Sequence, residues 1–239
     1  MNRPKIASHD EWLAARKALL AKEKAFTRER DALSAARRDL PMVKVEKRYV
    51  FEGAAGSKTL AELFEGKRQL IVYHFMFDPS WDEGCKSCSF IAESFDGMLP
   101  HLGARDTAFV AISRAPFRTL VAFQKRMGWS FPWLSSGDDG FNMDFAVSFT
   151  PEDVRDQKAD YNFATTKWHR TEGPGLSAFL RGEGDDVFHT YSTYGRGVDA
   201  LMTTYHYLDF TALGRNEAPG QGMAWLRHHD RYAPLNGAG

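Results

Sequence analysis

Cys85 and Cys88 are the only cysteines in this 239-residue chain, and they form a Cys-Lys-Ser-Cys motif. Two thiols separated by two residues at the start of a helix can close and reopen a disulfide. The unpaired amides at a helix start lower the pKa of the first thiol, and Lys86 adds a neighbouring positive charge. We therefore predict that Cys85 is the nucleophile. Cys88, about one turn further along, is the predicted resolving thiol, which attacks the mixed disulfide and releases the reduced substrate.

Three carboxylates, Asp78, Asp82 and Glu83, precede the motif. Negative charge beside a thiolate raises the pKa of the thiol, so these residues work against ionisation of Cys85. A partly buried carboxylate could instead act as an acid or base and accept the proton of Cys88. Any of the three is a candidate for that role.

Two other interpretations of the cysteine pair stay open. The pair could be half of a zinc site, with His74 or the sequence His228-His229-Asp230 supplying the remaining ligands that a closed site needs. Alternatively, both thiols could be inert, since free cysteines often fill protein cores. Because the chain has no second cysteine pair and no glycine-rich phosphate loop, we expect neither a metal nor a cofactor.

The composition restricts the classes of partner. Lys plus Arg and Asp plus Glu number 31 each, and this zero net charge argues against nucleic acid or an anionic membrane as a partner. No apolar run approaches the roughly 18 residues that span a bilayer, and the N-terminus lacks the apolar core of a secretory signal. We expect a cytoplasmic protein whose partner is a protein or small-molecule thiol or disulfide. In that compartment two cysteines rarely form a permanent disulfide.

The elements expected to position the cysteines alternate between strand and helix. Continuous apolar runs at 69–77 and 107–113 predict strands that are buried on both faces. Helices are predicted from residue 87 to about 102, after Pro116 and near 197–207, with an antiparallel hairpin at 176–181 and 187–192. Alternating strands and helices give parallel strands with right-handed crossovers, and the hairpin adds an antiparallel edge. This is the outline of an α/β, thioredoxin-like fold, a central mixed sheet flanked by helices.

A long helix is predicted ahead of this sheet. Ser8 and Glu11 have the spacing of a capping box, and Trp12, Leu19, Phe26 and Leu33 recur every seven residues in a charged segment that continues to about residue 38. Such an apolar stripe must be buried, either on its own domain or in a homodimer through helix 8–38. The predicted organisation is a helical arm at 1–40, a domain at 41–232 with an irregular insertion at 135–172, and a flexible tail at 233–239. Residues 43–51 alternate as a strand.

Several longer motifs carry a family resemblance. They are Tyr73-His-Phe-Met-Phe, Trp81-Asp-Glu-Gly-Cys, Ser113-Arg-Ala-Pro, Gly128-Trp-Ser-Phe-Pro-Trp, Phe188-His-Thr-Tyr-Ser and Gly222-Met-Ala-Trp. Over nearly its whole length the chain resembles the bacterial thioredoxin-like family known as domain of unknown function 899. The resemblance implies a thioredoxin-like fold and a dithiol-disulfide oxidoreductase, and it implies no particular substrate.

The resemblance to thioredoxins also implies two substrate-binding residues. Thioredoxins place a tryptophan directly before the first cysteine, whereas Trp81 stands four residues before Cys85. Pro174 resembles the cis-proline that lies against the dithiol and binds an extended substrate backbone. The alternative is an ordinary trans proline that opens an edge strand.

Two other functions are compatible with the fold. Peroxiredoxin-like peroxidases use a Pro-x-x-x-Thr-x-x-Cys loop and a distant arginine. Here no threonine lies between Pro79 and Cys88, and Arg114 and Arg196 are the candidate arginines. A non-catalytic thioredoxin-like binding module is the other alternative.

Overall fold

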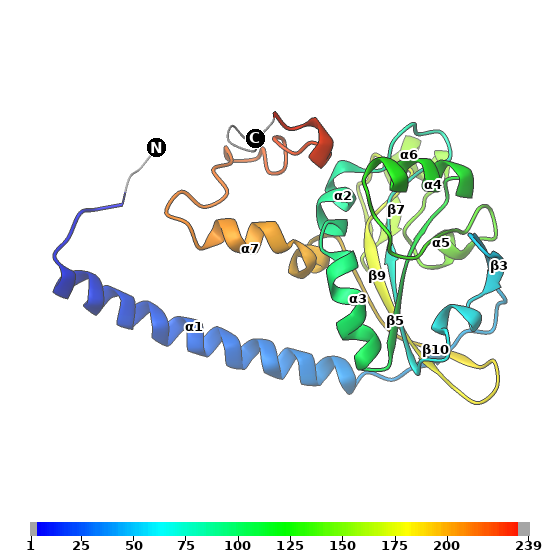
Figure 1. Ribbon diagram of the computed structural model, residues 1–239, viewed down its shortest axis with the longest axis horizontal. Helices are drawn as coiled ribbons and strands as arrows, with labels where there is room; N and C mark the ends of the chain where they lie inside the picture. The colour runs from blue at the N-terminus through cyan, green and yellow to red at the C-terminus, as the bar shows by residue number, and fades with distance from the viewer. Residues whose placement is uncertain (1–3, 234–239) are drawn as a thin grey trace.

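The central sheet has eight strands in the order β1-β10-β9-β4-β5-β6-β2-β3, in a computed structural model that describes residues 4–233 (Figure 1). At its centre β4 (Gln69–His74) runs parallel to β5 (Thr107–Ser113) and antiparallel to β9 (Gly175–Arg181). The strand β10 (Val187–Tyr194) pairs antiparallel with β9, and β6 (Trp133–Ser135) pairs parallel with β5. This mixed sheet confirms the predicted thioredoxin-like α/β fold, and the two apolar runs form its buried central strands.

Helices flank the sheet and supply the crossover between its parallel strands. The chain passes from β4 through α2 (Lys86–Ala92) and α3 (Phe95–Ala104) to β5, and then through α4 (Phe117–Arg126) to β6. After β10 come the 3-10 helix η2 (Gly195–Leu201) and α7 (Thr203–Asp209), where a single helix was predicted. Two short 3-10 helices lie elsewhere in the chain, η1 (Glu62–Phe64) before β4 and η3 (His229–Arg231) after α7.

The helix after the cysteines is broken, contrary to the prediction of one helix over 87–102. The break lies at Glu93 and Ser94, between α2 and α3. The Ser94 hydroxyl donates a hydrogen bond to the carbonyl oxygen of Ile91 at 3.1 Å. A serine side chain that bonds the backbone in this way competes with the regular helical ladder.

The predicted strand over 43–51 is also wrong. Its first part, β1 (Val43–Lys44), pairs with β10 at one edge of the sheet. Its last part begins β2 (Val50–Gly53), which pairs with β3 (Gly56–Thr59) and β6 near the opposite edge. Because β1 pairs with the outer side of β10, the β9–β10 hairpin does not form the edge of the sheet. Alternation predicts extended backbone, but it does not specify which strand the segment joins.

The segment 135–172 has more regular structure than the predicted irregular insertion. It contains the short helices α5 (Phe141–Asp144) and α6 (Pro151–Asp156) and a separate hairpin of β7 (Ala159–Tyr161) and β8 (Ala164–Thr166). Val147, Phe149 and Tyr161 form a small core of their own with Tyr194 from β10. Elements of three to six residues are too short to leave a readable period.

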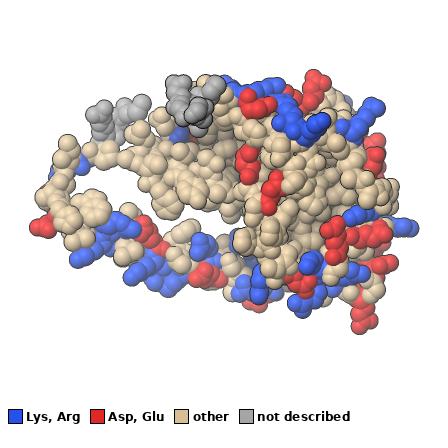
Figure 2. Space-filling view, viewed as in Figure 1, with Lys and Arg blue, Asp and Glu red and all other residues tan. Residues whose placement is uncertain are grey.

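The helix α1 (His9–Arg38) begins at Ser8, and its capping box with Glu11 is confirmed. It projects away from the sheet, and none of its residues is buried (Figure 1). The side chains of Trp12 and Phe26 remain 56% and 69% exposed, so the prediction that the stripe packs on its own domain is wrong. Figure 2 shows Lys and Arg side chains interspersed with Asp and Glu along this helix. No helix within residues 4–233 is long and apolar enough to cross a membrane.

Candidate redox site

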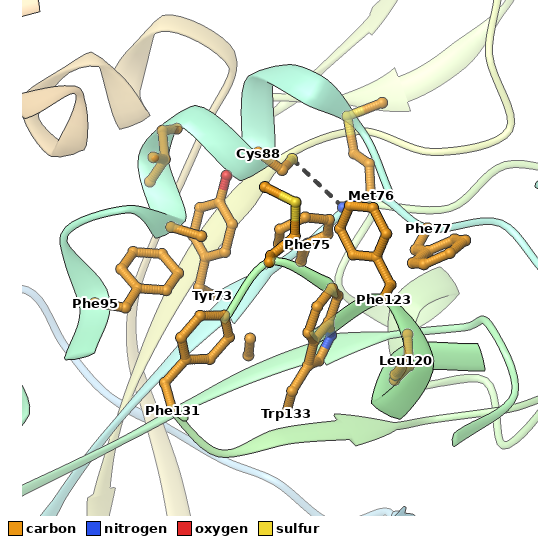
Figure 3. Close-up of a cluster of buried hydrophobic side chains, with 14 of the residues drawn as sticks. Tyr73, Phe75, Met76, Phe77, Cys88, Phe95, Leu120, Phe123, Phe131 and Trp133 are labelled. Carbon is orange, nitrogen blue, oxygen red and sulfur yellow. Dashed lines mark hydrogen bonds between the residues drawn. The ribbon is translucent and has the colours of Figure 1, made fainter. Parts of the chain in front are cut away.

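Both cysteines lie at the start of α2 and contact Met76, two residues beyond the end of β4. The amide of Cys85 donates a hydrogen bond to the carbonyl oxygen of Met76 at 3.1 Å, and the amide of Met76 lies 3.5 Å from the Cys88 sulfur (Figure 3). Cys85 is the N-cap residue of α2 and is partly exposed, whereas Cys88 is 1% exposed. Both thiols are free. The strand end, the turn and the helix therefore bring together the two cysteines that the spacing predicted.

Gly84 allows the chain to reach Cys85. A Cβ atom on this residue would lie 2.8 Å from the ring of Phe75 and 2.9 Å from that of Phe123. The Gly84 carbonyl oxygen lies 2.9 Å from Nε2 of His228, so a segment near the C-terminus also holds the turn. The sequence interpretation missed this contact, because nothing local to His228 indicates that it is buried against residue 84.

The surroundings shift the two thiols in opposite directions. The hydrogen bond from the Cys88 side chain is the largest influence on Cys85. Together with the amides of Cys88 and Ser87 and the charge of Arg170, it lowers the pKa of Cys85 to about 6, against the effect of burial. Burial raises the pKa of Cys88 well above its ordinary value. At neutral pH the outer sulfur is therefore a thiolate and the inner one a protonated thiol.

Tyr73 places a hydroxyl group beside the inner thiol (Figure 3). The residue is fully buried, and its hydroxyl forms no regular hydrogen bond within residues 4–233. Burial, followed by the charge of Cys88, raises the pKa of Tyr73 well above 10, so the phenol stays protonated. No sequence signal indicated this role, because the strand also carries Gln69 and His74 and the position of Tyr73 beside Cys88 depends on the fold.

The three carboxylates before the motif lie outside the pocket at the cysteines. Asp78 binds Arg114 at 2.9 Å and accepts hydrogen bonds from Ser80, which hold the pKa of Asp78 below its usual value although burial raises it. Glu83 forms ion pairs with Arg126 and Arg231. Asp82 is exposed. Their acid-base role stays a prediction that no contact supports.

Arg114 and Arg196, the candidate peroxide-binding arginines, are both engaged elsewhere. Arg114 bridges Asp78 and the carboxylate of Glu172, the latter at 2.7 Å. Glu172 is only 1% exposed, and burial raises its pKa to about 7. The side chain of Arg196 is 90% exposed and pairs with Asp199 at 2.9 Å. The network around Arg114 joins the ends of β4 and β5 to the segment before β9.

A pocket of about 440 Å³ opens above the cysteines, and we call it the dithiol pocket. Pro174 lines it, because the pairing of His74 with Gly175 brings the start of β9 beside the end of β4. The described residues contain no cis peptide bond, so Pro174 is a trans proline, and β9 is an internal strand and not an edge strand. Trp81 does not line the pocket and packs, partly buried, against the aromatic core.

The candidate zinc ligands are dispersed. His74 lies on the opposite face of the sheet from the dithiol, against Phe141. Its Nε2 is 2.8 Å from the Ser177 hydroxyl, and burial lowers the pKa of His74 to about 3. His228 is buried against Gly84, and His229 lies 2.8 Å from Glu93. Between residues 4 and 233, no three His, Cys, Asp or Glu side chains are grouped so that they could hold a metal ion.

The mixed sheet flanked by helices, with a Cys-x-x-Cys pair in the helix that follows β4, is a thioredoxin-like fold. The chain belongs to the family described as "Bacterial protein of unknown function (DUF899)", which matches residues 1–232. None of the curated proteins matches the sequence.

Solved structures similar to this chain include a peroxidoxin and a bacterioferritin comigratory protein. Peroxidoxin BcpB from Mycobacterium tuberculosis is 12% identical, with a TM-score of 0.47 over 71% of this chain and 97% of that one. The bacterioferritin comigratory protein of Xanthomonas campestris, whose structure is described with alkyl peroxide reduction activity, is 13% identical, with a TM-score of 0.46 over 70% and 96%. A hypothetical protein of Sinorhizobium meliloti is 16% identical, with a TM-score of 0.40 over 70% and 86%.

Proposed function

We propose that this protein is a thiol-disulfide oxidoreductase in which Cys85 is the nucleophile and Cys88 the resolving thiol. One observation carries the proposal: the partly exposed thiol has a pKa of about 6, and its buried neighbour stays protonated three residues away. The first is ready to attack at neutral pH, and the second keeps its proton until it is needed.

The exchange proceeds in two steps. The Cys85 thiolate attacks one sulfur of a substrate disulfide, forms a mixed disulfide and expels the other sulfur as a thiolate. Cys88 then loses its proton and attacks the Cys85 sulfur, which forms the 85–88 disulfide and releases the second substrate thiolate. The substrate gains two electrons, and the cysteine pair loses two. We also propose Trp81 and Pro174 as substrate-binding residues. Of the two, only Pro174 lines the pocket at the cysteines, which supports its role.

The test is to treat the reduced protein with a small disulfide and identify the products by mass spectrometry. The parent should form an intramolecular 85–88 disulfide. Cys88→Ser should stop at a stable mixed disulfide on Cys85, and Cys85→Ser should remain unmodified, because its remaining thiol is buried and protonated. If Cys85→Ser reacts as fast as the parent, the assignment of the nucleophile is wrong.

A peroxidase is the second candidate, favoured by the charge of Arg170 near Cys85. In that reaction the thiolate attacks one peroxide oxygen, the O–O bond breaks, and the other oxygen takes up a proton and leaves as water or an alcohol. Cys85 becomes a sulfenic acid, which condenses with Cys88 to give the disulfide and water. Hydrogen peroxide should then oxidise Cys88→Ser to a sulfenic acid at a rate far above that of a free thiol. A rate equal to that of a free thiol excludes this candidate.

We also propose that α1 forms an arm that associates with a second copy of the chain. The apolar stripe of α1 is exposed in the single chain, and its seven-residue period suits packing between two helices. The proposed compartment is the cytoplasm, where reducing conditions would keep the dithiol available for exchange.

A further inference from the structure

The two cysteines line a pocket together with residues from distant parts of the chain. Two segments from outside the central strands contribute to its lining, 168–170 and 195–202, and the second follows directly after β10. A volume of about 440 Å³ is in the range of small-molecule sites. A pocket of this size suits a small disulfide that reacts at the partly exposed Cys85.

The walls nearest the cysteines are apolar. They are formed by Met76, Ile91, Val198, Met202 and Met223. Methionine side chains are flexible and polarizable, so such walls adapt to an apolar ligand of irregular shape. The buried Tyr73 hydroxyl, which also lines the pocket, is left without a regular hydrogen-bond partner. Its neighbour there is the Cys88 sulfur, to which it can donate a weak hydrogen bond.

The charge at the mouth of the pocket is positive and localised. Arg196 is neutralised by Asp199, with Nε of the arginine 2.9 Å from the carboxylate. The guanidinium of Arg170 forms no ion pair or hydrogen bond with any residue between 4 and 233, and it lines the same pocket as Cys85. An unpaired arginine at an apolar pocket fits the planar geometry of a carboxylate.

We propose that the dithiol pocket takes a low-molecular-weight disulfide with an apolar body and a carboxylate, and that Arg170 binds the carboxylate. The inference rests on the proposed function and specifies its substrate class. With a cyclic disulfide, the Cys85 thiolate opens the ring and forms a mixed disulfide. Cys88 then attacks the Cys85 sulfur, and the substrate leaves as a dithiol after taking up two protons. In the reverse direction the dithiol reduces the 85–88 disulfide through the same intermediate.

The test uses a matched pair of probes, dihydrolipoate and its neutral amide, dihydrolipoamide. Each reduces the oxidised full-length protein, and the rate is followed by acid quenching, thiol alkylation and mass spectrometry. Each rate is divided by the rate of the same probe with a free model disulfide, which removes differences in intrinsic reactivity. The zero net charge of the chain gives the acid no general electrostatic advantage, so a preference would report the pocket.

The parent should react about five to ten times faster with the acid than with the amide, a modest ratio because Arg170 is exposed to solvent. In Arg170→Gln the ratio should fall to about one, whereas the control Arg196→Gln should keep the ratio of the parent. Any effect of Arg170 on the ionisation of Cys85 alters both rates equally and cancels in the ratio. The normalised rate of reduction should also be higher for dihydrolipoamide than for dithiothreitol, a polar dithiol.

Equal rates for acid and amide in the parent, or a ratio that Arg170→Gln leaves unchanged, would overturn the role of Arg170. Equal normalised rates for dihydrolipoamide and dithiothreitol would overturn the apolar preference. In both cases dithiothreitol would still reduce the 85–88 disulfide, so the oxidoreductase proposal would stand. If no dithiol reduces the protein, or no such disulfide forms, both proposals fail together.

Discussion

The low pKa of Cys85 predicts how the rate of its alkylation changes with pH. The shift from an ordinary value of 9.0 to about 6 amounts to about 4 kcal/mol of preference for the thiolate over the thiol. At pH 7 about 90% of Cys85 is then ionised, against about 1% of an ordinary thiol. A low pKa also weakens the nucleophile, however, and with a Brønsted coefficient of 0.4–0.5 the loss over this shift is roughly 20-fold.

These two effects give a rate advantage that reverses with pH. Relative to a free thiol of ordinary pKa, alkylation of Cys85 should be about 40-fold faster at pH 5, about fourfold faster at pH 7 and about tenfold slower at pH 9. The assay is the rate of modification by iodoacetamide, measured by mass spectrometry from about pH 4.5 to pH 9.5. The rate should level off above about pH 7, one unit above the pKa.

A matched pair of variants tests the physical cause. The hydrogen bond from the Cys88 side chain is the largest influence that lowers the pKa of Cys85. Cys88→Ser keeps a donor at that position and should keep the low inflection. Cys88→Ala removes the donor and should move the inflection upward by more than one pH unit. Identical profiles for the two variants, or an inflection near 9 in Cys88→Ser, would refute the reasoning.

Three further predictions concern other parts of the fold. Burial raises the pKa of Glu172 to about 7, so the parent should lose up to about 3 kcal/mol of its free energy of unfolding as the pH rises from 4.5 to 7. In Glu172→Gln the free energy of unfolding, measured with urea, should depend less on pH. An equal pH dependence in parent and variant would contradict this. Phe26→Lys places a charge in the exposed stripe of α1 and should shift a parent dimer toward monomer in sedimentation analysis. The rate of Cys85 alkylation should not change. A parent that is already monomeric would refute the α1 interface. Gly84→Ala should cost about 1–3 kcal/mol because its methyl group meets Phe75 and Phe123, and an unchanged unfolding midpoint would argue against this packing.

Local pattern determined the parts of the fold that depend on near neighbours. The continuous apolar runs became β4 and β5, because only a strand covered on both faces can bury every side chain. The capping box at Ser8 formed as predicted, since its two partners are three residues apart. Because Cys85 and Cys88 are only three residues apart, both likewise lie against Met76, just beyond the end of β4.

Predictions that depended on distant partners failed more often. Residues 43–51 were extended in part, but β1 and β2 lie near opposite edges of the sheet, and alternation contains no information about pairing. Arg114 was a candidate at the reacting centre, yet two buried carboxylates from separate segments bind it. The stripe on α1 was recognised, but its position away from the sheet was not.

The sequence by itself determined that this protein has one cysteine pair, placed between a buried strand and a helix. The position of Cys85 at a helix start already predicted its ionisation. Only the tertiary structure decided how deeply Cys88 is buried, that its side chain is the largest influence on the pKa of Cys85 and that Arg170 lines their pocket. The physical reason is that burial and electrostatic potential depend on which groups surround an atom. Here those groups come from segments far apart in the chain, and no local periodicity records their meeting.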